Sequence, residues 1–144
     1  MDQKTGKILA IDYGSASIGL AVSDDSRIMA FSRGVLRKLT KDEAIGKIIA
    51  LVNEEKVKLV ILGLPMSVDG GETSQTVKIR EFGSKLAQEL SKTDVPLEYV
   101  DESFSSFEAQ KMLENLNVKA MDRKKTEDEL AAVVLVRRYI DFRP

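Results

Sequence analysis

The sequence predicts an α/β protein built on one mixed five-stranded sheet with flanking helices. Three observations lead to this prediction. Short apolar segments bounded by turn residues recur along the chain, as strands do. In the second part of the chain they alternate with longer segments whose apolar residues recur every three to four positions, as on a helix face. The 144 residues suit one hydrophobic core, and no repeat or Pro/Gly-rich linker divides them.

The first third of the chain predicts three strands. Residues Ile8–Asp12 are apolar without alternation, which is typical of a strand covered on both faces. In Ile18–Val22 large apolar residues alternate with smaller ones, which favours a strand covered on one face only. A third strand is expected at about Ile28–Leu36. The links between these strands are short, and short links favour an antiparallel meander.

A helix, a strand and a second helix are expected next. Thr40 and Glu43 have capping-box spacing, and they precede a helical apolar stripe formed by Ile45, Ile48, Ile49 and Val52. Residues 57–65, VKLVILGLP, predict a buried strand that ends at Gly63 and Pro65. The second helix has an apolar face formed by Ile79, Phe82, Leu86 and Leu90.

The last third of the chain predicts one more strand and two more helices. Residues 96–102, PLEYVDE, predict the strand. Ser105 and Glu108 open a third helix, whose apolar face is formed by Ala109, Met112, Leu113 and Leu116. A polar, basic loop follows, and a third capping box at Thr126 and Glu129 begins the last helix.

The order of the elements determines the strand directions. The meander makes the first strand parallel to the third, and helical crossovers make the third, fourth and fifth strands parallel to one another. The first, fourth and fifth strands therefore end at one edge of the sheet, where open α/β sheets bind ligands. Asp12, the segment 63–65 and the pair Asp101 and Glu102 are thus brought together by topology.

Composition limits the chemistry that these residues can perform. The chain has no Cys and no His, which excludes thiol nucleophiles, imidazole bases and Cys/His zinc sites. A metal, if used, is therefore a hard ion held by oxygen, such as Mg²⁺ or Mn²⁺. The net charge of −1 argues against a strongly basic nucleic-acid-binding protein. No apolar run has the length of a membrane span, so we expect a cytoplasmic protein without a membrane partner.

Each acidic candidate also has an ordinary structural explanation. Asp12, followed by the permissive Gly14, is the type of residue that bonds the backbone of a turn. Side chains alternate along a strand, so only one of Asp101 and Glu102 faces the site. The acids at 127–129 also suit the first turn of a helix, and periodicity does not choose among them. Taken together, clustered carboxylates favour a divalent cation, and two such ions would support phosphodiester hydrolysis.

Two further segments have a possible role in binding nucleic acid. The basic loop holds four cations within seven residues, namely Lys119, Arg123, Lys124 and Lys125. They are candidates for contacts with phosphates, although such a run is also typical of a solvated connector. Gly63 and Pro65 either stop a strand or let a nucleic-acid backbone approach closely.

Four segments, spread over nearly the whole length of the chain, resemble segments of a known protein family. They are ILAIDYGSASIGLAVSD at 8–24, VILGLPMSVDGGETSQT at 60–76, DESFSSFEA at 101–109 and KKTEDELAAVVLV at 124–136. In this order and spacing they resemble the YqgF family, which belongs with the RuvC-type resolvases in the ribonuclease H-like superfamily. The resemblance implies a single RNase H-like domain over residues 1–144. The implied strand order is 3-2-1-4-5, with strand 2 antiparallel.

The resemblance also implies a function. The family's acidic triad maps onto Asp12, Glu102 and Asp128, which would bind Mg²⁺ or Mn²⁺. The family is described as a nuclease maturing the 5′ end of pre-16S rRNA and as a Holliday junction resolvase. Its members often carry basic residues where this chain has Ala16 and Ser17. They usually have Arg where this chain has Ser103, and the sequence leaves open whether the protein is a monomer or a homodimer.

Two hypotheses from other classes are kept beside the nuclease. A non-catalytic nucleic-acid-binding or assembly factor is compatible with the missing basic residues. An ATP-binding enzyme of the actin or Hsp70 type also places an Asp-x-Gly after its first strand. Such enzymes pair two domains around the nucleotide, and the length of this chain argues against that arrangement.

Overall fold

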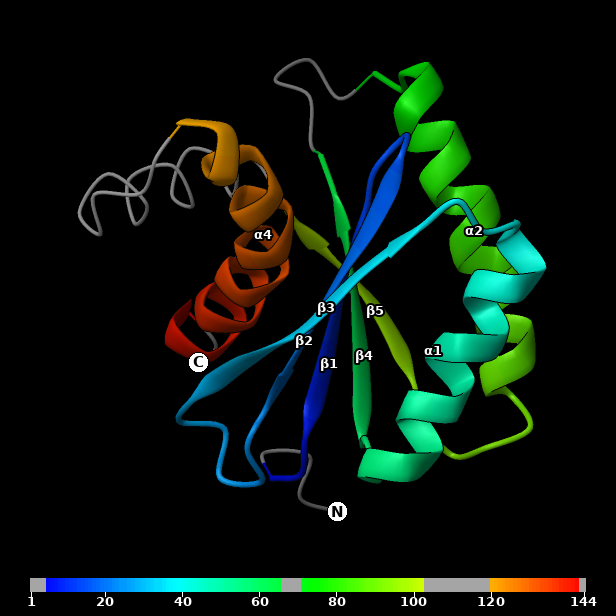
Figure 1. Ribbon diagram of the computed structural model, residues 1–144. Helices are drawn as coiled ribbons and strands as arrows, with labels where there is room; N and C mark the ends of the chain where they lie inside the picture. Colours follow the sequence, from blue (N-terminus) through cyan, green and yellow to red (C-terminus); the bar gives the residue numbers. More distant parts are fainter. Residues whose placement is uncertain (1–4, 66–70, 103–119, 143–144) are drawn as a thin grey trace.

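The computed structural model describes residues 5–65, 71–102 and 120–142, and Figure 1 shows their arrangement around a central sheet. The elements are β1 (Ile8–Tyr13), β2 (Ser17–Ser23), β3 (Ala30–Arg37), α1 (Lys41–Glu55), β4 (Leu59–Leu64), α2 (Ser74–Leu90), β5 (Leu97–Asp101) and α4 (Ala120–Phe142). The predicted helix at residues 105–116 lies outside the described residues. Among the described residues, no helix combines the length and apolar composition needed to cross a membrane.

The sheet has the expected strand order, β3-β2-β1-β4-β5. β2 is antiparallel to β1 and to β3, whereas β4 is parallel to both β1 and β5. The predicted mixed sheet with an antiparallel second strand is therefore confirmed. Because β1, β3, β4 and β5 share one direction, all four end at the same edge of the sheet, called here the site edge.

Helices cover both faces of the sheet (Figure 1). α1 and α2 pack on one face through the residues that periodicity predicted, including Ile48 and Phe82. α4 packs on the other face over the side chains of Ile8, Ala10 and Ile61. The side chains of β1 alternate between these two cores, and Asp12 follows Ile8 and Ala10 onto the face covered by α4.

Local signals account well for the start of α1. The Thr40 hydroxyl accepts a hydrogen bond from the Glu43 N–H at 3.1 Å, and the Glu43 carboxylate accepts one from the Thr40 N–H at 2.9 Å. This reciprocal pair is the predicted capping box. α1 ends at Lys56, which takes a left-handed conformation with φ of 56°.

Two predictions about strands are wrong. β2 is buried on both faces from Ile18 to Ser23, because α4 lies directly on its small residues. Gly63 does not end its strand but lies inside β4, which continues to Leu64 before Pro65.

The predicted start of the last helix is also wrong. α4 begins at Ala120, so Thr126 lies within the helix rather than at its start. Arg123, Lys124 and Lys125 are therefore helical residues and not part of a loop. The segment 120–125 is rich in residues with high helix propensity, and this preference extends the helix toward its amino end. Lys119 lies outside the described residues.

Candidate active site

Two of the predicted acids meet at the site edge. Asp12 lies near the end of β1, and Glu102 directly follows β5. The Glu102 N–H donates a hydrogen bond to the Leu64 carbonyl at 3.3 Å, which keeps Glu102 in line with the sheet. The two half-buried side chains are joined by a hydrogen bond between their carboxyl groups. Of the neighbours Asp101 and Glu102, Glu102 is thus the one whose carboxyl group meets Asp12.

Gly63 makes room for the Glu102 side chain. A Cβ atom built on Gly63 would lie 2.6 Å from Glu102 Oε2 and 3.0 Å from Leu135 Cδ1. Ordinary van der Waals contact begins at about 3.4 Å, so no side chain fits here unless its neighbours move. Gly63 therefore leaves the space that the Glu102 side chain occupies, and Glu102 is a catalytic candidate. Gly63 is not the loop residue that the sequence suggested.

The pairing of the acids changes the ionisation of Glu102. Burial disfavours its charged form most strongly, and the hydrogen bond to Asp12 and the negative charges of Asp12 and Asp101 act in the same direction. Together they raise the pKa of Glu102 from 4.5 to about 9. Glu102 therefore keeps its proton at neutral pH.

Asp128 lies close to Asp12, but its carboxylate forms an ion pair with Arg37. A Cβ atom on Gly19 would lie 2.5 Å from the Asp128 carbonyl oxygen and 3.7 Å from Asp12 Cβ, so α4 passes over β2 beside Asp12. The carboxylate of Asp128 accepts a hydrogen bond from Arg37 Nη2 at 3.1 Å. Within the described part of the chain, no three acidic side chains lie close enough together to hold a metal ion.

The sequence reasoning missed Arg37. It is the last residue of β3, and β3 is parallel to β1. The predicted strand directions already placed the end of the third strand at the site edge. A basic residue at that end was therefore a signal that the sequence contained.

Gly14 has a structural role in the turn between β1 and β2. Its N–H donates a hydrogen bond to the Ser17 carbonyl at 2.8 Å, and a Cβ atom on Gly14 would lie 2.9 Å from that same oxygen. The turn thus closes tightly on itself. This geometry fits a hairpin rather than a loop that wraps a nucleotide.

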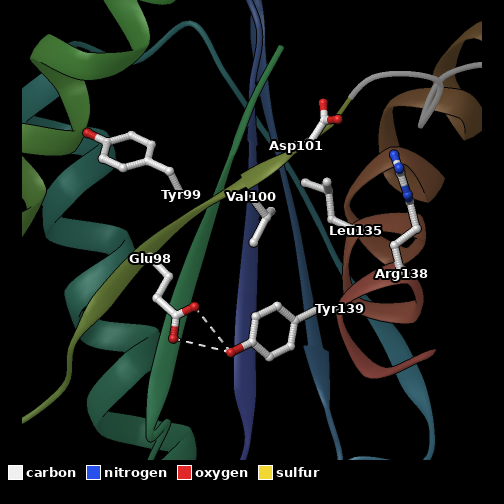
Figure 2. A pocket seen from close by; sticks show the side chains of 7 residues that line it. All are labelled: Glu98, Tyr99, Val100, Asp101, Leu135, Arg138 and Tyr139. Atoms are coloured by element: carbon white, nitrogen blue, oxygen red, sulfur yellow. Dashed lines mark hydrogen bonds between the residues drawn. The ribbon is translucent and has the colours of Figure 1, made fainter. Parts of the chain in front are cut away.

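A pocket of about 370 Å³ lies between β5 and α4, next to the acids. Figure 2 shows the seven residues that line it: Glu98, Tyr99, Val100, Asp101, Leu135, Arg138 and Tyr139. The Tyr139 hydroxyl lies 3.2 and 3.3 Å from the two Glu98 carboxylate oxygens and donates a hydrogen bond to that carboxylate. Among these described residues, two carry carboxylates and one carries a guanidinium.

Comparison with solved structures assigns the fold to a class. The structure titled "T. thermophilus RuvC in complex with Holliday junction substrate" matches with a TM-score of 0.56 and 15% identity, over 94% of this chain and 95% of that one. The yeast mitochondrial Holliday junction resolvase Ydc2 matches with a TM-score of 0.59 and 10% identity, over 94% and 78% of the two chains. The fold is that of the RuvC-like nucleases.

Sequence comparison then identifies the family. The model described as "RuvX: Holliday junction resolvase" matches residues 6–142, so the chain belongs to this family, which is the YqgF family of the resemblance. A Maridesulfovibrio salexigens protein named "Putative pre-16S rRNA nuclease" is 34% identical over 93% of this chain and 97% of its own. A Dictyoglomus turgidum protein of the same name is 33% identical over 94% of both chains. The family is one of nucleases, which hydrolyse phosphodiester bonds, and such nucleases depend on divalent metals.

Proposed function

We propose that this protein is a nuclease that cleaves precursor 16S rRNA with Asp12, Glu102 and Asp128 as its catalytic acids. The observation that carries the proposal is the hydrogen-bonded pair of carboxyl groups on Asp12 and Glu102 at the site edge. A pair of close carboxyl groups gains most from a cation, which lets both groups ionise together. We place the reaction in the cytoplasm, where ribosomes are assembled.

The residues of the site fit a hard divalent cation, Mg²⁺ or Mn²⁺. All three acids offer oxygen ligands, and the whole chain contains no Cys or His that would favour a softer metal. Asp12 and Glu102 already converge, and Asp128 is next to them on α4 with its carboxylate on Arg37. When bound, the metal supplies an activated water and stabilises the leaving 3′ oxygen.

The protein's own groups prepare the site in three ways. Asp12 is fixed by a strand whose other residues are packed in the two cores. Glu102 holds a proton at neutral pH, and its carboxylate would be free to bind a metal once that proton leaves. Lys119, Arg123, Lys124 and Lys125, which precede Asp128 in the sequence, are proposed to contact backbone phosphates.

Pre-16S rRNA is favoured as the substrate over a DNA junction. Two relatives that carry the rRNA name match this chain over nearly its whole length at 34% and 33% identity. Two resolvases of known structure match it at only 15% and 10% identity, which supports a shared fold rather than a shared substrate. Junction resolution is the second candidate, because the family model carries that description. A resolvase cuts two symmetric strands and would require a homodimer.

A cleavage assay with two substrates tests the proposal. The purified protein is incubated with an RNA spanning the 5′ end of 16S rRNA and with a four-way DNA junction, each with Mn²⁺ or with chelator. We expect cleavage of the RNA with Mn²⁺ only, and loss of that cleavage in Asp12→Asn. Asp25→Asn, an exposed acid at the turn between β2 and β3, serves as the matched control. Equal cleavage by Asp12→Asn and the parent would contradict the proposed site, and cleavage of the junction alone would favour resolution.

A further inference from the structure

We propose that Arg37 is a substrate-binding residue that contacts an RNA phosphate beside the catalytic acids. This inference rests on the proposed function and adds a residue to it. The ion pair between Arg37 and Asp128, 3.1 Å long, places a guanidinium directly at the site edge. No sequence motif assigns this arginine a role, and its position follows from the sheet alone.

The strand register explains how Arg37 reaches the site. β3 and β1 are both antiparallel to β2, so β3 ends at the same edge as Asp12. Arg37 is paired in the sheet with Ser17, which begins β2 just after the hairpin turn. Paired residues on antiparallel strands share a face, and the contact with Asp128 on α4 identifies that face.

The geometry of the ion pair leaves Arg37 able to bind a second anion. Among the described residues, its only ion pair uses the single nitrogen Nη2 and one oxygen of Asp128. A guanidinium has five N–H donors in a planar fork that matches two phosphate oxygens. The Arg37 side chain is 43% exposed, and ion pairs at such exposed positions are weak. Arg37 can therefore turn from Asp128 to a phosphate at little cost.

Arg33, on the same strand as Arg37, has a side chain that two contacts with one carboxylate already hold. Its Nε and Nη2 atoms lie 2.6 and 3.0 Å from the two carboxylate oxygens of Glu55 at the end of α1. This two-point contact holds the side chain in place, away from the three acids. Arg33 is therefore a matched control, because it has the same charge and lies on the same strand.

The hairpin turn beside Asp12 brings no cation of its own. The turn and the first residue of β2 contain Ala16 and Ser17, which are uncharged. Arg37 lies across from Ser17 and supplies a cation to the same place from the neighbouring strand. Moving the charge back across the pair should therefore restore function.

The first experiment measures RNA binding without cleavage. Fluorescence anisotropy follows a labelled pre-16S RNA fragment with proteins that all carry Asp12→Asn. We expect Arg37→Met to weaken binding by about tenfold, because it removes a charge-assisted contact. It should also lower the slope of log K against log salt by about one. Arg37→Lys should lie between parent and Arg37→Met, because it keeps the charge and loses the fork. Arg33→Met should bind as the parent does.

The second experiment tests the position of the charge. Adding Ser17→Lys to Arg37→Met should recover most of the lost affinity, whereas Lys in place of the exposed Ser26 should not. In the active protein, Arg37→Met should raise KM more than it lowers kcat, since the contact is made before and during the reaction. Equal urea midpoints for all variants would establish that folding is unchanged.

The outcomes separate this inference from the proposed function. If Arg37→Met binds RNA with the affinity and salt slope of the parent, Arg37 is only a structural partner of Asp128 and the inference is wrong. Rescue at position 26 as strong as at position 17 would also overturn it, because any added charge would then suffice. Failure of the proposed active site appears instead as undiminished cleavage by Asp12→Asn in the cleavage assay, and the binding assay measures no cleavage.

Discussion

Replacing Gly63 with alanine is a precise perturbation of the proposed site. The new methyl group would point from β4 into the space that Glu102 occupies. It would lie 2.6 Å from Glu102 Oε2, 3.0 Å from Leu135 Cδ1 and 3.1 Å from Glu102 Cβ. The closest of these atoms belongs to the end of a flexible side chain. We therefore expect the carboxylate to move and the strand to stay.

The size of this movement follows from the distances. Oε2 must retreat by about 0.8 Å to pass from 2.6 Å to the 3.4 Å of ordinary van der Waals contact. A displacement of about 1 Å in a catalytic group lowers rates by on the order of a hundredfold. Overpacking costs about 1–3 kcal/mol of unfolding free energy, and replacing a glycine at a compatible backbone conformation returns about 0.4–1 kcal/mol. The rate should thus fall about a hundredfold, while the net loss of unfolding free energy, from near zero to about 2.6 kcal/mol, leaves the protein folded.

Cleavage of labelled RNA and urea unfolding measure the two effects separately. Gly46→Ala is the control, because a Cβ atom at Gly46 on α1 meets nothing within 4 Å. The control should keep its activity and gain about 0.5–1 kcal/mol of stability from helix propensity. If Gly63→Ala cleaves at the parental rate, Glu102 does not act from the position described, and the reasoning fails. Loss of activity together with unfolding would also refute it, because the site would then not be the part that moves.

Three further predictions concern stability. In protein without metal, native Glu102 keeps a proton that the unfolded chain loses, so the free energy of unfolding should fall as pH rises from 4.5 to about 9. Urea unfolding across this range should show that trend, and Asp12→Asn should weaken it without removing it, because burial, the largest cause of the raised pKa, remains. Ser23→Ala removes the buried hydroxyl that accepts the Ile8 N–H at 2.8 Å, and should cost about 1–3 kcal/mol in the same assay. Gly19→Ala forces a methyl group to within 2.5 Å of the α4 backbone; calorimetry should show a destabilisation of about 1–3 kcal/mol, and an unchanged melting temperature would contradict that packing.

Much of the fold could be predicted because its signals are local or topological. The capping box of Thr40 and Glu43 lies within four residues, and the structure contains it as expected. Short links and helical crossovers fix strand directions without any knowledge of packing. The meeting of Asp12 and Glu102 followed from those directions, although Asp101 and Glu102 were separated only by the family resemblance.

The two errors about strands have a common physical cause, because a small residue in a strand can face either water or a close neighbour. In β2, Gly19 and Ala21 alternate with large apolar residues, and this pattern is typical of a strand with one exposed face. Here they are small because α4 lies directly on them: a methyl group at Gly19 would meet its backbone. Gly63 likewise resembles a strand end in the sequence, yet it lies inside β4 under the Glu102 side chain. Sequence alone does not distinguish a residue that faces water from one that faces a close neighbour.

These two glycines also explain why the acids gather where they do. Gly19 is paired with Asp12 across β1 and β2, and Gly63 follows Leu62, the partner of Ile11, on the other side of β1. Asp12 is thus flanked by a glycine on each neighbouring strand. The backbone of Asp128 lies over Gly19, and the side chain of Glu102 lies over Gly63. Because larger residues would hold both away from Asp12, we infer that the missing side chains shape the site as much as the three acids do.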